Sequence, residues 1–299
     1  MESLVRGRRS LFALLCLCFF IAAPAFPERQ SPLRSPYDRV VARAYRSCDS
    51  HVFGLPRGTG LNGQRILGGI VPHHDVAMGM IMRFYEELNA GDRICPVQRV
   101  FLFAPDHFRQ VRRWAAVCPA NWMFFGDPTR VLSADADAIT TLGDADIVEM
   151  RSEIFEKEHG ITLHIPFIAL FFPNATVVPI LLRPDIPDIA LLSLRKRLAA
   201  IMREGDVVIL SMDLSHYKPL EALRAEDDRT IAALTEMRHA ATHRLDVDAP
   251  RAAKLALLLF KDGGATRGTL LKRSDTSAIL GEHIESGTGY ATILYGVDE

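Results

Sequence analysis

The chain has 299 residues, of which 48% are hydrophobic and 24% are charged, and its formal net charge is -1 at pH 7. This composition is typical of a globular protein and provides enough apolar material for one large hydrophobic core or two modest ones. Proteins that bind nucleic acid normally carry a clustered basic surface, so the near balance of charges argues against nucleic acid as a partner.

The N-terminal segment has the features of an export signal. Arginines at positions 6, 8 and 9 precede an apolar run over residues 11–23, and Ala23, Pro24 and Ala25 have the small-x-small form of a signal peptidase site. A retained membrane anchor is the alternative, but the run is shorter than the roughly 20 apolar residues that a spanning helix needs. We therefore expect residues 1–25 to be a cleaved signal peptide. The mature protein would be exported to the bacterial periplasm, with membrane contact only through this signal.

Without the signal the chain keeps Cys48, Cys95 and Cys118. An odd number permits at most one intramolecular disulfide, and a bond between Cys95 and Cys118 is the pairing that we expect. Because no Cys-x-x-Cys pair occurs, a structural zinc site built on thiolates has no support.

A lead-in segment over residues 26–65 is rich in Arg, Pro, Ser and Gly and shows no sustained period. The apolar run at 66–71 then predicts a strand, and apolar residues at helical spacing over 76–88 predict a helix. A second strand is expected at 100–104, with residues 114–117 pairing nearby.

The rest of the chain continues this alternation. A helix introduced by Ser133 is expected over 132–150, and the remaining elements are helices at 188–204, 220–242 and 250–260 and strands at 177–182, 206–211 and 290–295. Strands that alternate with helices favour an α/β fold with three layers, in which helices cover both faces of a mixed, largely parallel central sheet. Nothing in the pattern divides residues 66–299 into two domains.

Six of the ten histidines lie in four short segments: VPHHD at 71–75, FAPDH at 103–107, EHGITLH at 158–164 and SMDLSH at 211–216. The first, second and fourth of these segments directly follow a predicted strand. Loops beyond the carboxyl ends of parallel strands converge on one crevice, so these residues are expected to form a single site.

His73 and His107 are the leading candidates for metal ligands. Neutral imidazole binds zinc, iron or copper, and a catalytic site typically uses three protein ligands with one position left open. The nearby carboxylates of Asp75 and Asp106 are expected to orient the rings. For any one histidine the alternative is a loop that its side chain caps by hydrogen bonding, and the occurrence at three strand ends favours the metal site.

Asp213 and His216 add a possible acid/base pair. If the SMDLSH loop makes a helical turn, the i, i+3 spacing puts both side chains on one face, where they can contact each other or a ligand. The competing interpretation is that Asp213 caps a helix.

His159 and His164 are five positions apart, so they lie on different faces of an ideal helix and cannot both bind one metal from it. Glu158 or His159 is expected to reach the site, and His164 to be a packed or supporting residue. We expect the histidines without a strand-end context to be surface or packing residues: His51, His239, His243 and His283.

The segments VPHH, FAPDHF, EHGITLHIPF, VVPILL, ILSMDLSH and GYATILYG occur in this order over residues 66–296. This ordered set resembles the Memo-like family, also called AmmeMemoRadiSam system protein B. The resemblance implies a fold similar to class III extradiol dioxygenases, which hold non-haem Fe(II) with two histidines and a carboxylate, and it implies a comparable metal pocket here. By resemblance, His73, His107 and His216 with Asp213 match the pocket residues, and Glu158 with His159 matches the EHS segment.

The chain departs from the family pattern in two respects. Some members place a cysteine in the pocket from the segment before the final strand, whereas Leu280 stands near that position here. Members are also commonly cytoplasmic, whereas an export signal is expected for this chain.

Our first hypothesis is a metal-dependent redox or dioxygenase-like enzyme. His73, His107 and His216 would hold a divalent transition metal, with Fe(II) favoured over copper or zinc, and His216, His159 and Asp213 would act in catalysis. The same pocket would also suit a zinc-dependent hydrolase. The contrasting hypothesis is a non-catalytic metal-binding or peptide-binding module, so the expected partner is a small molecule or a peptide.

Overall fold

The computed structural model describes residues 31–47, 64–90, 96–124 and 127–298. The expected signal peptide over 1–25 and most of the lead-in segment lie outside these ranges. The described part of the lead-in forms strand β1 (Leu33–Arg34) and helix α1 (Asp38–Ser47). Within the described ranges, no helix combines the length and apolar character that crossing a membrane requires.

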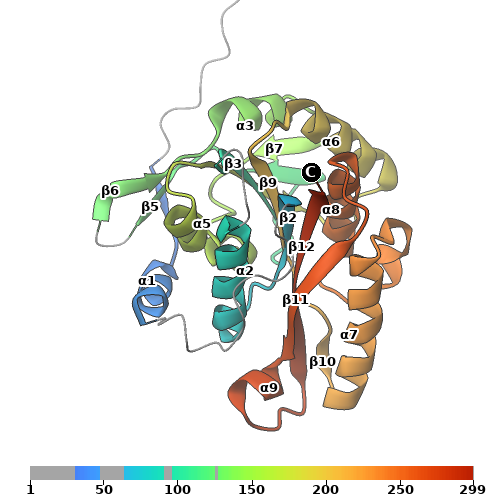
Figure 1. Ribbon diagram of the computed structural model, residues 1–299. Helices are drawn as coiled ribbons and strands as arrows, with labels where there is room; N and C mark the ends of the chain where they lie inside the picture. The colour runs from blue at the N-terminus through green and yellow to red at the C-terminus, as the bar shows by residue number, and fades with distance from the viewer. Residues whose placement is uncertain (1–30, 48–63, 91–95, 125–126, 299) are drawn as a thin grey trace, which may run out of the picture. The chain divides into compact units, whose positions relative to one another are not determined.

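A nine-stranded sheet forms the centre of the fold (Figure 1). Its strands are β2 (Gln64–Val71), β3 (Arg99–Pro105), β4 (Ala115–Val117), β7 (Val148–Met150), β8 (Thr176–Leu182), β9 (Asp206–Ser211), β10 (His216–Lys218), β11 (Gly268–Asp275) and β12 (Gly287–Asp298). The order is β10-β12-β2-β9-β3-β8-β4-β7, and β11 pairs along β12. Strands β2, β9, β3 and β8 run parallel, whereas β12 and β4 are antiparallel to β2 and β8. The predicted mixed, largely parallel sheet is confirmed.

Helices cover both faces of this sheet (Figure 1). They are α2 (Met78–Ala90), α3 (Ala136–Gly143), α4 (His159–Thr162), α5 (Ile165–Phe171), α6 (Asp188–Ile201), α7 (Leu220–Thr235), α8 (Pro250–Asp262) and α9 (Thr276–Leu280), with 3-10 turns at Asp75–Ala77 and His239–Arg244. A second, three-stranded sheet joins β1 with β5 (Trp122–Phe124) and β6 (Asp127–Leu132).

Strand β3 shows how the two cores are separated. Phe101 and Phe103 pack into the core shared with α3, α6, α7 and α8, whereas Leu102 and Ala104 pack into the core shared with α2 and α5. Successive side chains of a strand point to opposite faces, so a strand buried on both faces needs a continuous apolar run. This explains why β3 lacks the polar alternation of a strand with one solvent-exposed face.

The prediction of one helix over 132–150 is wrong at both ends. Helix α3 begins after Asp135, whose side chain accepts a hydrogen bond from the Ala138 amide at 2.9 Å, so Asp135 and not Ser133 is the cap. The chain then leaves the helix, and Val148 begins β7 beside β4. Val148 packs in the same core as Leu142 of α3.

Two other expected helices are shorter than predicted. Helix α7 ends at Thr235 instead of 242, because Met237 has a left-handed φ of 54° and the chain resumes as a 3-10 turn. Helix α6 ends at Ile201 instead of 204, where Met202 becomes extended.

The expected disulfide between Cys95 and Cys118 is not formed. Cys118 is a buried free thiol at the end of β4, and burial raises its pKa to about 12. Cys48 and Cys95 lie outside the described residues.

Candidate metal centre

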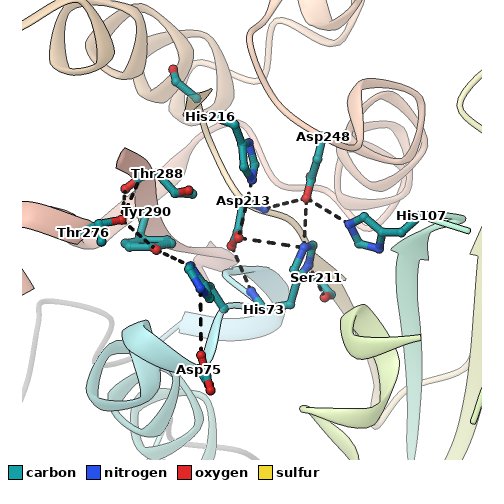
Figure 2. Close-up of polar contacts among 12 residues, drawn as sticks. His73, Asp75, His107, Ser211, Asp213, His216, Asp248, Thr276, Thr288 and Tyr290 are labelled. Carbon is teal, nitrogen blue, oxygen red and sulfur yellow. Dashed lines mark hydrogen bonds and ion pairs between the residues drawn. The ribbon is translucent and has the colours of Figure 1, made fainter. Parts of the chain in front are cut away.

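Three loops that follow parallel strands meet at one edge of the sheet. His73 lies after β2, His107 after β3 and Asp213 after β9. The ring centroids of His73 and His107 are 4.8 Å apart. Asp213 Oδ2 is 3.9 Å from His73 Nε2. The loops after these three strands therefore converge, but the residue that the third loop places beside the rings is Asp213 and not the predicted ligand His216 (Figure 2).

His159 completes a group of three imidazole rings. It is the first residue of α4, and its ring centroid is 4.2 Å from that of His107 and 5.0 Å from that of His73. One ring nitrogen from each of these three histidines lies within 4.8 Å of the others. Nitrogens at this spacing could surround a single metal ion, because metal–imidazole bonds are about 2.0–2.1 Å long.

Asp248 is not among the residues predicted from the sequence, yet it lies beside two of these rings. Its Oδ2 is 2.9 Å from His73 Nε2 and 3.5 Å from His107 Nε2. Its Oδ1 is buried and has no hydrogen-bond partner among the described residues. Asp248 lies two residues before Pro250, the first residue of α8. In the sequence this position can be identified only as the start of a helix, and that signal does not point to a metal site.

Two hydrogen bonds orient the imidazole rings. Ser211 Oγ lies 2.9 Å from His73 Nδ1, and Glu158 Oε1 lies 2.6 Å from His107 Nδ1. Glu158 also accepts a hydrogen bond from the His107 backbone amide at 3.1 Å. Because the Nδ1 atoms are engaged in this way, the Nε2 atoms of both histidines are left to face a metal.

The carboxylates expected to orient the rings have other positions. Asp106 accepts hydrogen bonds from the backbone amides of Gln110 and Val111 at 2.9 Å, so it stabilises the loop after β3. Asp75 is 59% exposed and lies 3.9 Å from His74 Nε2. Glu158 and Ser211 take the orienting role that the sequence suggested for these two residues.

The SMDLSH loop forms no helical turn, and Asp213 caps no helix. Its Oδ1 accepts a hydrogen bond from the His73 backbone amide at 3.0 Å. Its Oδ2 is 3.8 Å from Nε2 of His216, the first residue of β10. The structure therefore brings His216 beside Asp213, at the border of the three-histidine group.

Acidic neighbours raise the pKa of two of the imidazoles. Burial lowers the pKa of His107, but hydrogen bonds and charge interactions with Asp248 and Glu158 outweigh it and raise the pKa to about 10. Burial also lowers the pKa of His73, and the carboxylates of Asp213 and Asp248 again more than compensate. Without a metal, the His107 imidazole would therefore be cationic near neutral pH.

The third imidazole behaves in the opposite way. Burial, and then the charges of His73 and His107, lower the pKa of His159 to about 4. Burial favours the protonated form of Asp248, but the two neighbouring imidazolium groups hold the pKa of this carboxyl well below its ordinary value. The Asp248 carboxylate thus lies between two imidazole rings whose pKa values are raised, and a divalent cation bound at this point would compete with protons for the ring nitrogens.

A series of hydrogen-bonded side chains lies next to the site, between α9 and the loop after β2 (Figure 2). Tyr290 Oη lies 2.5 Å from His74 Nδ1 and 3.1 Å from Thr276 Oγ1. His164 does not enter the site: it is fully buried, and its Nδ1 lies 3.2 Å from Tyr85 Oη. His164 is therefore packed, as predicted.

Two large apolar side chains of neighbouring segments, Phe108 and Leu280, are solvent-exposed. Phe108 is 51% exposed, and its ring centroid is 6.4 Å from that of His159. Leu280, at the end of α9, is 49% exposed.

The residues present suit a divalent transition metal. The donor atoms are imidazole nitrogens and carboxylate oxygens, and they fall into two overlapping groups that share His73. One comprises His73, His107 and His159, and the other comprises His73, Asp213 and Asp248. The unpartnered, buried Oδ1 of Asp248 is a further donor atom that a cation would satisfy.

Comparisons with known proteins identify the family of this chain. The family model of Memo-like proteins matches residues 53–294. A MEMO1 family protein of Caldivirga maquilingensis is 26% identical over 250 residues, covering 78% of this chain and 84% of that protein. A MEMO1 family protein of Pyrobaculum arsenaticum is 26% identical over 244 residues, with the same coverage of both chains.

A solved structure shares the fold. The crystal structure of an uncharacterized protein of Escherichia coli K12 aligns with a TM-score of 0.51 and 14% sequence identity, covering 77% of this chain and 99% of that one. The family model spans most of the chain, from before β2 into β12. The chain therefore belongs to the family of Memo-like proteins.

Proposed function

We propose that this protein is a metal-dependent enzyme that uses Fe(II), with copper as the alternative metal, for dioxygenase-like redox chemistry on a small organic substrate; zinc in the same site would instead suit a hydrolase. The observation that carries the proposal is the group of His73, His107 and His159, with ring nitrogens within 4.8 Å of one another. Histidine and carboxylate ligands with open positions are the donor set of non-haem Fe(II) oxygenases.

In this proposal His73 and His107 are the primary ligands. Their Nδ1 atoms are held by Ser211 and Glu158, which fixes both rings with Nε2 toward the centre. His159 would replace His216 as the third imidazole, because its ring lies closer to the other two. When bound, Fe(II) would supply Lewis-acid and electron-transfer chemistry toward oxygen.

Asp213 and His216 are proposed to move protons. An imidazole can accept a proton and return it, provided that it is within reach of the reacting group. The His216 side chain is 27% exposed, and its Nε2 is 3.8 Å from Asp213 Oδ2. His216 therefore has access both to solvent and to a buried carboxylate.

The substrate would enter past His159. The His73 side chain is 2% exposed, whereas those of His107 and His159 are 22% and 38% exposed. The site is thus closed behind His73 and open beside His159. The exposed ring of Phe108 next to His159 would offer an apolar contact to a substrate at this opening.

Metal analysis of protein purified anaerobically tests the proposal. We expect close to one equivalent of iron, and we expect the Fe(II) protein to bind nitric oxide with the electron paramagnetic resonance signal of an iron–nitrosyl complex. That signal requires a vacant coordination position and a redox-capable metal. Zinc as the native metal would favour the hydrolase. Protein that binds none of these metals, or a closed metal shell, would instead support the non-catalytic metal- or peptide-binding module.

A further inference from the structure

Asp248 lies at the point toward which the two oriented imidazoles face. Its Oδ2 is 2.9 Å from His73 Nε2 and 3.5 Å from His107 Nε2, so one oxygen approaches both nitrogens. Donor atoms in neighbouring positions around an ion with bonds of about 2.1 Å are themselves about 3.0–3.4 Å apart. The observed distances match that spacing.

The surroundings of the Asp248 carboxylate favour a role as a metal ligand over a role as an ion-pair partner of the two histidines alone. The Asp248 side chain is 13% exposed. Its Oδ1 is buried and finds no hydrogen-bond partner within the described ranges. A carboxylate that served only as an ion-pair partner would be expected to satisfy both oxygens, because leaving a buried polar atom unpaired costs about 1–3 kcal/mol.

The loop that carries Asp248 is fixed at both ends. On one side, Asp246 forms an ion pair with Lys218 of β10 at 2.5 Å. On the other, the Ala249 carbonyl accepts a hydrogen bond from the Ala253 amide in the first turn of α8. The Asp213 amide also lies 3.4 Å from Asp248 Oδ2. These contacts hold the carboxylate in place before any metal binds.

We propose that Asp248 is a carboxylate ligand of the metal, contributed by the loop before α8, and that it makes the centre selective for Fe(II) or Mn(II) over Cu(I). The inference deepens the proposed function and rests on it. Carboxylate oxygen suits Mn(II) and, together with imidazole, Fe(II), whereas thiolate and thioether ligands select Cu(I). Cys118, the one cysteine in the described part of the chain, is buried in the core shared with α2 and α5 and is not among the groups of converging donor atoms.

Metal titrations of the full chain and three variants test this role. In Asp248→Asn the side chain keeps its shape but loses its charge, and we expect the affinity for Fe(II) and Mn(II) to fall more than about 100-fold, beyond the roughly 10–100-fold effect of an orienting residue. Asp75→Asn is the matched control, since it removes an exposed carboxylate at the rim, and it should bind within about threefold of the parent.

Asp248→Cys provides a spectroscopic readout that does not depend on affinity or activity. With Co(II) as the probe, this variant should show a thiolate-to-cobalt charge-transfer band in the near ultraviolet that the parent lacks. Its preference should also move from Mn(II) toward Cu(I).

The outcomes separate the two proposals. If the parent binds Fe(II) tightly and Asp248→Asn binds it within threefold, Asp248 is not a ligand, although the proposed function stands. If the Asp248→Asn variant does not fold, the Co(II) spectrum of Asp248→Cys decides, and a bound cobalt without the thiolate band overturns the inference. Failure of the parent to bind any of these metals refutes the proposed function itself.

Discussion

The carboxylate of Asp213 accepts a hydrogen bond from the backbone amide of His73 at 3.0 Å, although the two residues are 140 positions apart in the chain. This bond joins the loop after β2 to the loop after β9, so the two loops cannot shift independently. It also engages Oδ1 and leaves Oδ2 facing Nε2 of His73 and of His216. One side chain therefore combines a structural contact with a position inside the site.

Two substitutions of Asp213 should separate these roles. Asp213→Asn keeps an oxygen that can accept from the His73 amide, and we expect a metal affinity roughly 10–100-fold lower with nearly unchanged stability. Asp213→Ala leaves the buried His73 amide without an acceptor. The free energy of unfolding should therefore fall by a further amount of about 1–3 kcal/mol. Calorimetric metal titration and urea unfolding measure the two effects. Equal stabilities of the two variants would contradict the structural role.

His73→Ala and His107→Ala should each abolish tight metal binding. Both remove an imidazole whose orientation is fixed by a neighbouring hydrogen bond, so the remaining donors cannot complete the shell. His239→Ala, on the 3-10 turn before α8, is the control and should bind like the parent. Folding should persist in all three variants, and circular dichroism checks this. Tight binding by either site variant would refute the assignment of that ligand.

His216→Ala should retain metal binding, contrary to the ligand role that the sequence suggested. Its nearest contact in the site is the 3.8 Å approach to Asp213 Oδ2, and the two groups of converging donor atoms do not include it. We expect an affinity within about fivefold of the parent, which is less than the roughly 10–100-fold loss that even an orienting residue causes. A loss as large as that of His73→Ala would restore His216 as a ligand.

Much of the site could be predicted from the sequence because the strands that carry it are buried on both faces. Such strands are continuous apolar runs, so polar residues directly after one stand out, as Asp106 and His107 do after β3. The parallel pairing of β2, β9 and β3 then brings the ends of these strands together. Asp248 has no such signal, because the packing of α8 against β9 brings it to the site.

The orienting partners could not be predicted for a related reason. Adjacency in sequence suggested Asp106 for His107, but the Asp106 carboxylate turns back toward the amides of its own loop. Glu158 reaches His107 from 51 positions away because it caps α4 beside the end of β3. Which of several carboxylates faces a ring depends on tertiary packing and leaves no local pattern.

His164 should make the protein sensitive to mild acid. Burial, and then the charge of His73, lower its pKa to about 3 in the folded protein, whereas an unfolded chain has a histidine pKa of about 6.5. The unfolded state therefore binds a proton first as the pH falls. The stability is highest above pH 6.5 and decreases toward the folded pKa, by about 1.4 kcal/mol for each pH unit.

His164→Gln tests this sensitivity. The variant removes the titrating group but keeps a polar atom near the Tyr85 hydroxyl, which lies 3.2 Å from His164 Nδ1 in the parent. We expect it to be less stable than the parent at pH 7.5 but to lose less stability between pH 6.5 and pH 4.5. Urea unfolding of the metal-free proteins at several pH values gives the two slopes. Parallel profiles would show that His164 does not control the acid response.

Gly68→Ala should prevent folding, because two independent requirements at this position exclude a side chain. The backbone φ of Gly68 is 142°, and an added Cβ would lie 1.8 Å from the Val208 carbonyl oxygen of β9. Val208 is paired with Gly68 in the parallel ladder, so neither strand can move without breaking the sheet at its centre. We expect the free energy of unfolding to fall by more than about 4 kcal/mol, a loss that a single substitution causes only through a severe defect such as steric overlap in the core.

Gly281→Ala is the matched control for this substitution. Gly281 also has a positive φ, of 72°, but nothing lies within 4 Å of an added Cβ, so only the cost of the left-handed backbone, roughly 1–2 kcal/mol, should remain. Soluble yield and urea unfolding measure both variants. Because β2 and β9 carry the loops of His73 and Asp213, any Gly68→Ala protein that is recovered should also have lost its metal affinity. If Gly68→Ala instead unfolds with the stability of Gly281→Ala and binds metal like the parent, the close approach of β2 to β9 does not hold the site together.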